Sequence, residues 1–103
     1  MTAEALARAL EAEISRRLAP GGARIELAPG ADTGPLYGAA LFAEGAVTPF
    51  AWSASCGSRE EAFRGLVESF IRSSARSALG FPRWSSPEEL ELWLAVSGGG
   101  GAR

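Results

Sequence analysis

The segment SREEAFRGLVESFIRSSARSAL, which runs from Ser58 to Leu79, decides the fold of this chain. Its apolar residues recur at steps of three and four, so a helix over this range has one apolar face. Ser58 and Glu61 have the spacing of a capping box, in which the serine accepts the Glu61 N–H and the Glu61 carboxylate reaches back to the Ser58 N–H. Gly80 is suited to the left-handed residue that closes a helix. The segment therefore predicts one amphipathic core helix.

Three segments before this helix have the patterns of strands. Ala23–Ala28 alternates apolar and charged residues, which is typical of a half-buried edge strand. Leu36–Ala43 is apolar on both faces, which is typical of a central strand. A tight turn at Glu44-Gly45 leads to a third strand, Val47–Cys56. Because Pro49 cannot donate to a ladder, this strand is expected at a sheet edge or with a bulge.

Two further helices are predicted near the ends of the chain. Thr2–Leu18 begins with a capping threonine and carries an apolar stripe, and Pro87–Val96 follows a second capping box over Ser86-Pro87-Glu88-Glu89. The predicted fold class is α+β in the order α-β-β-β-α-α, a three-stranded antiparallel meander with two helices packed on one face and a short C-terminal helix. The second sheet face is then either exposed or covered by the C-terminal helix. We expect one domain over residues 1–97 and a flexible glycine-rich tail over 98–103.

The composition argues against several classes of function. The 103 residues include one cysteine, Cys56, and no histidine, so the usual general base and the commonest zinc ligand are both absent. We therefore expect no enzymatic activity, no metal and no cofactor. A small enzyme is an alternative only if Cys56, which precedes a helix N-terminus, is reactive. The segment Pro29–Pro35 is a candidate functional loop whose role the sequence leaves open.

Nothing in the sequence indicates export or membrane insertion. No apolar run approaches the ~18 residues of a transmembrane helix, and a single cysteine cannot form an internal disulfide. We therefore expect a cytoplasmic protein. All 10 basic residues are arginines, and alanine and glycine are abundant, which is typical of a GC-rich bacterial or phage coding sequence.

The helix-strand-strand-strand-helix order resembles double-stranded-RNA-binding domains. Gly34-Pro35, ahead of the second strand, and Ser58-Arg59-Glu60-Glu61-Ala62, at the start of the core helix, lie where that family has its landmarks. The resemblance implies a nucleic-acid-binding module. In that family lysines open the final helix, whereas here Glu60 and Glu61 follow Arg59 and would repel a phosphate backbone. Nucleic-acid binding is therefore the alternative hypothesis, with candidate contacts at Arg59, Arg64, Arg72 and Arg76.

Three tryptophans in so short a chain favour a protein-binding surface. If the C-terminal helix does not fit fully over the sheet, its apolar residues form an interface patch. The alternative is that these residues only close the second sheet face. We expect a small non-enzymatic protein-binding or regulatory module that binds a protein partner or itself, through a face rather than a strand edge. Such a module fits an accessory or inhibitor protein of a phage or other mobile element. The candidate interface residues are Trp84, Leu90, Trp93 and Leu94.

Overall fold

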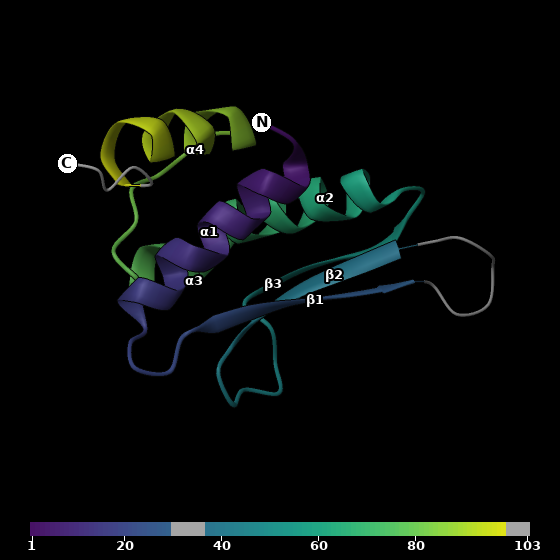
Figure 1. Cartoon of the computed structure of the whole chain (residues 1–103), viewed down its shortest axis with the longest axis horizontal. Helices are drawn as coiled ribbons and strands as arrows, with labels where there is room; N and C mark the ends of the chain where they lie inside the picture. Colours follow the sequence, from purple (N-terminus) through teal and green to yellow (C-terminus); the bar gives the residue numbers. More distant parts are fainter. Residues whose placement is uncertain (30–36, 99–103) are drawn as a thin grey trace.

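Three strands form one antiparallel sheet, and helices lie on only one of its faces (Figure 1). The computed structural model describes residues 1–29 and 37–98. Most of the predicted loop at 29–35 and of the predicted tail at 98–103 therefore lies outside the described residues. In chain order the elements are α1 (Ala3–Arg17), β1 (Ala23–Pro29), β2 (Tyr37–Ala43), β3 (Ala51–Cys56), α2 (Arg59–Arg72), α3 (Ser74–Ala78) and α4 (Pro87–Trp93), which continues as a π-helical turn over Leu94–Gly98.

The sheet has the predicted order β1-β2-β3, with β2 in the centre. Ile25 of β1 lies opposite Leu41 of β2, and Leu41 lies opposite Ala51 of β3. Leu41 and Ala51 are buried beneath the helices. Successive side chains of a strand point to opposite faces of the sheet, so these residues mark the face that the helices cover. The pairing shifts by one residue between Tyr37 and Ala39, which places a bulge in β3.

The third strand is shorter than predicted, because it begins at Ala51 and not at Val47. Pro49 lies in the connection from β2, outside the strand, so the turn at Glu44-Gly45 does not lead directly into a ladder. Phe50 joins the connection to the ladder through a 2.8 Å hydrogen bond from its N–H to the Leu41 carbonyl oxygen. The predicted tight turn at Glu44-Gly45 does form, with a 3.0 Å hydrogen bond from the Ala46 N–H to the Ala43 carbonyl oxygen and Gly45 at φ +81°. It does not join the two strands directly, since several residues separate it from β3.

The core helix is interrupted where the sequence predicts continuity. α2 ends at Arg72, and Ser73 is extended with φ −85° and ψ 156° before the short helix α3 begins. Both the N–H and the Oγ of Ser73 donate to the carbonyl oxygen of Phe70, at 3.0 and 2.9 Å. A serine that bonds to nearby backbone competes with the helical ladder in this way. Gly80, at φ +84°, has the predicted left-handed conformation.

Both predicted capping boxes form in part. Ser58 Oγ accepts the Glu61 N–H at 3.1 Å, as predicted, and the equivalent bond in the second box joins Ser86 Oγ to Glu89 N–H at 3.3 Å. Glu61 does not reach back to the Ser58 N–H, however, but to the N–H of Gly57 at 2.9 Å. Glu89 behaves in the same way and accepts from the N–H of the residue before its cap at 2.8 Å. The caps thus extend one residue further upstream than the pattern implies.

α2 is the centre of the molecule and is enclosed by α1, the sheet and α4. Its apolar face is fully buried at Phe63, Val67 and Phe70, which confirms the predicted core helix. α4 packs on the helical layer and not on the sheet, so among the described residues no helix covers the second sheet face (Figure 1). None of the helices in residues 1–29 and 37–98 is long and apolar enough to cross a membrane.

Helix side chains occupy backbone groups at both edges of the sheet. Ser15 of α1 accepts the Ala23 N–H at 3.0 Å and donates to the Ala23 carbonyl oxygen at 3.3 Å. A Glu11 carboxylate oxygen accepts the Ile25 N–H at 2.8 Å. At the other edge, Ser69 Oγ of α2 accepts the N–H of Trp52 at 3.2 Å. Unpaired edge groups attract further strands, and these contacts reduce that tendency.

Candidate protein-binding face

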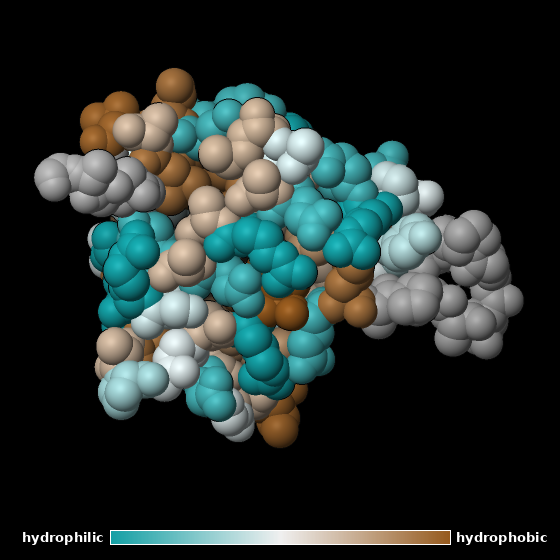
Figure 2. Space-filling view, in the orientation of Figure 1, coloured by the Kyte–Doolittle hydropathy of each residue, from teal (hydrophilic) through white to brown (hydrophobic). Residues whose placement is uncertain are grey.

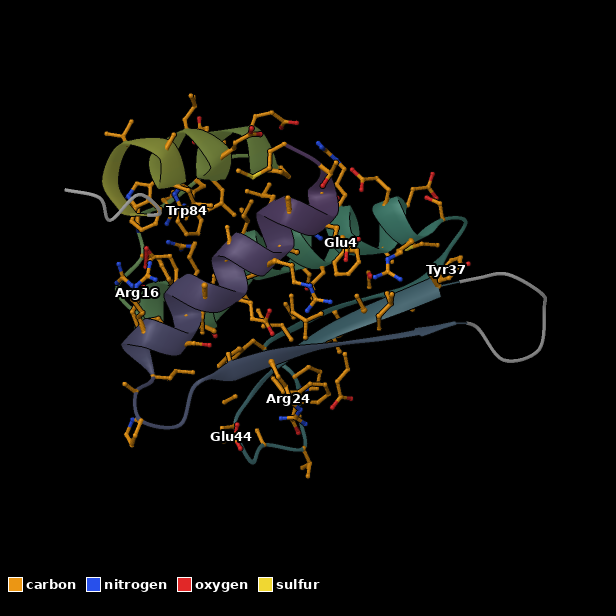
Figure 3. The ribbon with its side chains drawn as sticks, viewed as in Figure 1. Glu4, Arg16, Arg24, Tyr37, Glu44 and Trp84 are labelled. Atoms are coloured by element: carbon orange, nitrogen blue, oxygen red, sulfur yellow. The ribbon has the colours of Figure 1, made fainter. Side chains whose placement is uncertain are left out.

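Three of the four predicted interface residues lie inside the molecule. Trp84, Leu90 and Leu94 are buried, and Trp93 is half-buried. Trp84 lies between α4 and the helices below it (Figure 3). Its ring centroid is 5.3 Å from that of Phe81 and 5.5 Å from that of Trp93, at tilted and edge-on angles typical of aromatic packing. Trp84, Leu90 and Leu94 are part of the hydrophobic core and close the helical layer.

The opposite face of α4 is the exposed one. Leu92 and Val96 are 66% and 82% exposed, and Figure 2 shows apolar surface over the C-terminal end of this helix. Both faces of the segment carry apolar residues, so periodicity alone does not distinguish the packed face from the exposed one. Sequence reasoning therefore chose the buried side of α4 as the interface.

Two of the four predicted nucleic-acid contacts are neutralised by carboxylates. Arg59 pairs with Glu4 at 3.0 Å, and Arg64 pairs with Glu68 and Glu88, both at 3.1 Å. The hydrogen bond from Arg59 lowers the pKa of Glu4, and the hydrogen bond from Arg64 lowers the pKa of Glu88. These carboxylates are therefore ionised at neutral pH, and they offset the positive charge that a phosphate backbone needs.

The other two predicted nucleic-acid contacts are Arg72, the last residue of α2, and Arg76 of α3. Arg76 donates to three backbone carbonyl oxygens, those of Ile71, Phe81 and Pro82, at 3.1 to 3.4 Å. Arg72 is exposed, and its side chain has no hydrogen-bond or ion-pair partner within residues 1–29 and 37–98. The four arginines therefore do not form one unpaired basic stripe.

Cys56 ends β3 without the surroundings of a nucleophile. It is half-buried, and its thiol donates to the Ala54 carbonyl oxygen at 3.6 Å. Within the part of the chain that the structure describes, no three His, Cys, Asp or Glu side chains are grouped so as to hold a metal ion. The thiol is therefore accounted for by a contact with the backbone of its own strand.

The uncovered sheet face carries the most exposed aromatic side chain of the described residues. Trp52 of β3 is 60% exposed. In the sheet register it lies opposite Ala40 of β2, which in turn lies opposite Glu26 of β1. Beside the tryptophan is a shallow hollow of about 250 Å³, lined among others by Gly38, Ala40 and Phe42. Small residues in the central strand therefore leave space on this face.

The charges on this face are balanced and held in place. Arg24 Nε donates to a Glu26 carboxylate oxygen at 2.9 Å, and the Arg24 guanidinium lies 4.6 Å from the centroid of the Phe42 ring. A second Arg24 bond, at 3.3 Å, reaches the Ala43 carbonyl oxygen. Figure 3 shows Arg24 pointing away from the helices, on the side of the sheet that they do not cover. An apolar centre flanked by paired charges is the usual composition of a protein contact surface.

Sequence reasoning missed Trp52 as a surface residue, although a signal was present. In β3 the tryptophan alternates with Ala51 and Ser53, whose small side chains let α2 approach the strand closely. Large residues facing outward and small ones facing a helix indicate which side is covered. Comparison of the chain with protein-family models, with curated proteins and with solved structures gives no match.

Proposed function

We propose that this chain is a non-enzymatic protein-binding module that pairs with a second copy of itself through the uncovered sheet face. The single observation that carries the proposal is the position of Trp52, which is 60% exposed beside a hollow on a sheet face that no described helix covers. Tryptophan is the residue type most enriched among those that dominate binding energy at interfaces.

The surface suits a copy of itself because it holds both a projection and a recess. In a two-fold contact the same patch meets itself, so each feature must find its complement on the same face. Here the Trp52 side chain projects beside a hollow floored by Gly38 and Ala40. A two-fold rotation can place each indole over the small residues of the other copy.

Electrostatics and the strand edges favour the same arrangement. Arg24 and Glu26 carry opposite charges on one face, so two such faces do not repel each other. The contacts of Ser15, Glu11 and Ser69 with edge backbone groups disfavour addition of a strand from another chain. Contact through the sheet face is therefore favoured over contact through an edge.

The size of the face sets the strength of the contact. Three strands of this length present a flat area of about 300 Å², against the ~800 Å² that each partner buries in a standard stable interface. The dimer is therefore expected to be weak and dependent on concentration.

Sedimentation equilibrium on the full chain, from about 1 μM to about 500 μM, tests the proposal. The native chain should change from monomer to dimer over this range. Trp52→Ala should remain monomeric throughout, with a melting temperature within a few degrees of the native chain, because the side chain has few intramolecular contacts to lose.

Leu92→Ala is the matched control, since Leu92 is about as exposed as Trp52 but lies on α4. This variant should dimerise like the native chain. A native chain that stays monomeric over the whole range contradicts the proposal. Loss of the dimer in Leu92→Ala but not in Trp52→Ala would assign the contact to α4 instead.

A further inference from the structure

The break between α2 and α3 creates an open hollow lined by arginines. The chain turns at Ser73, and the segment from 81 to 85 folds back beside it. Arg76 holds this arrangement through its bonds to the carbonyl oxygens of Phe81 and Pro82. The resulting hollow is about 550 Å³ and open to solvent. Its lining residues are Ile71, Arg72, Ser73, Ser74, Arg76, Arg83, Trp84 and Ser85.

The hollow concentrates positive charge in a chain whose net charge is −2. Among the described residues its walls contain three arginines and no carboxylate. Arg72 and Arg83 are exposed, and neither side chain has a hydrogen-bond or ion-pair partner within residues 1–29 and 37–98. The other exposed arginines of α2, Arg59 and Arg64, both pair with glutamates. Carboxylates flank the hollow without lining it: Glu68 lines the adjoining hollow with Arg72, and a Glu89 carboxylate oxygen accepts the Ser85 N–H at 2.8 Å. Three like charges around a space that no described carboxylate lines favour the binding of an anion.

The three arginines of the hollow differ in their hydrogen bonds. Arg76 is fixed by bonds from Nε and Nη1, and its Nη2 group donates to no described residue. The side chains of Arg72 and Arg83 are exposed, and Ser74 and Ser85 line the same space. Guanidinium groups match the oxygens of a phosphoryl group with paired N–H donors, and a second negative charge strengthens the attraction.

We propose that this hollow binds the phosphoryl group of a phosphomonoester, with Arg76 as the fixed contact and Arg72 and Arg83 closing on it from the sides. A phosphomonoester carries close to two negative charges at neutral pH and three acceptor oxygens. It therefore suits three arginines better than a carboxylate does. The site lies on the helical layer and is independent of the pairing proposed for the sheet face.

The test is a titration of the full chain, followed by the amide resonances of Ser73, Ser74, Arg83 and Ser85. The probes are inorganic phosphate and O-phosphoserine at constant ionic strength, with acetate as the anion control. Both phosphate probes should shift these resonances and saturate, and acetate should not. O-phosphoserine binding more tightly than phosphate would identify an organic phosphate as the source, and equal affinities would identify free phosphate.

The double variant Arg72→Gln/Arg83→Gln should bind phosphate at least about ten-fold more weakly, because each charge-assisted hydrogen bond accounts for roughly that factor. Arg59→Gln is the matched control, on the same helix but about 20 Å away, and should bind like the native chain. Equal shifts with acetate, or unchanged affinity in the double variant, would overturn the inference. Tighter binding of an oligonucleotide without terminal phosphates would reassign the hollow to phosphodiesters and also overturn it.

Discussion

A single glycine sets the distance between the core helix and the sheet. A Cβ atom placed at Gly65 of α2 would lie 2.9 Å from the Cβ of Ser53 in β3, closer than real contacts of this kind allow. The Ser53 hydroxyl also donates to the Ala62 carbonyl oxygen at 2.7 Å, which fixes the strand against the helix. Glycine is otherwise unfavourable in a helix by about 1 kcal/mol. Its presence here is explained by the close approach of the two backbones.

Gly65→Ala should therefore destabilise the chain in spite of the better helix propensity of alanine. We expect the overpacking cost of about 1–3 kcal/mol to exceed the ~1 kcal/mol gained in propensity. A net loss of about 1 kcal/mol lowers the melting temperature by roughly 4–8 °C in a domain of this size. Thermal unfolding followed by circular dichroism measures this change.

Gly21→Ala is the control for this substitution. The nearest atom to a Cβ at Gly21 is the Glu44 Cβ at 3.4 Å, an ordinary contact, so the melting temperature should stay nearly constant. A more stable Gly65→Ala variant would show that the strand moves away from the helix at little cost.

At the scale of elements, the features that depend on neighbouring residues could be predicted from the sequence. The caps at Thr2, Ser58 and Ser86 form as their spacing indicates, since each satisfies a helix N–H from within one turn. The order of strands also follows, because the most apolar segment becomes the central strand. These features need little knowledge of the tertiary structure.

The features that the sequence did not predict depend on tertiary contacts. The extended conformation of Ser73 is accompanied by the bonds of Arg76 to the segment after α3, which helical periodicity cannot reveal. The packed face of α4 is also a tertiary choice, because Leu90 and Leu92 are equally apolar. The sequence also favoured contact through a face over contact through an edge, which stays a prediction, but it did not single out Trp52 of β3 as an exposed residue.

The two leucines of α4 provide a direct test of which face packs. Leu90→Ala should lower the free energy of unfolding by about 2–5 kcal/mol, the range for a fully buried leucine. Leu92→Ala should change it by less than about 0.5 kcal/mol because that side chain is 66% exposed. Urea unfolding of both variants measures the difference. Similar losses in the two variants would contradict the described orientation of α4.

At the scale of the whole molecule, exposed ion pairs connect the helices. Glu4–Arg59 joins α1 to α2, and Arg64–Glu88 joins α2 to α4. The amino group of Met1 lies 3.4 Å from a carboxylate oxygen of Glu91 in α4. Each pair is exposed and contributes little alone, but together they span the helical layer.

These pairs predict how stability depends on pH. The arginine partners lower the pKa of Glu4 and of Glu88 below the usual 4.5. A carboxyl with a lowered folded-state pKa stabilises the fold above its unfolded pKa, and this contribution is lost as pH falls through the folded value. With no histidine in the chain, no transition near pH 6.5 is expected.

Urea unfolding from about pH 7 to about pH 3 should therefore show a nearly constant free energy down to about pH 5 and a decrease below it. The double variant Glu4→Gln/Glu88→Gln should lose less stability over the acidic range. Added salt should weaken the difference between the two proteins because both pairs are exposed. An identical acid dependence of the variant and the native chain would show that other carboxyls are responsible.

The side chains that occupy the sheet edges limit how far this protein can assemble. With backbone groups of Ala23, Ile25 and Trp52 already bonded to α1 and α2, incoming chains find few places to extend the ladder. A contact made through a flat two-fold face is used up once two copies have met. If the chain pairs through its sheet face as we propose, assembly should therefore terminate at a pair, and crowded solutions of this protein should stay clear where open-ended stacking would produce fibres.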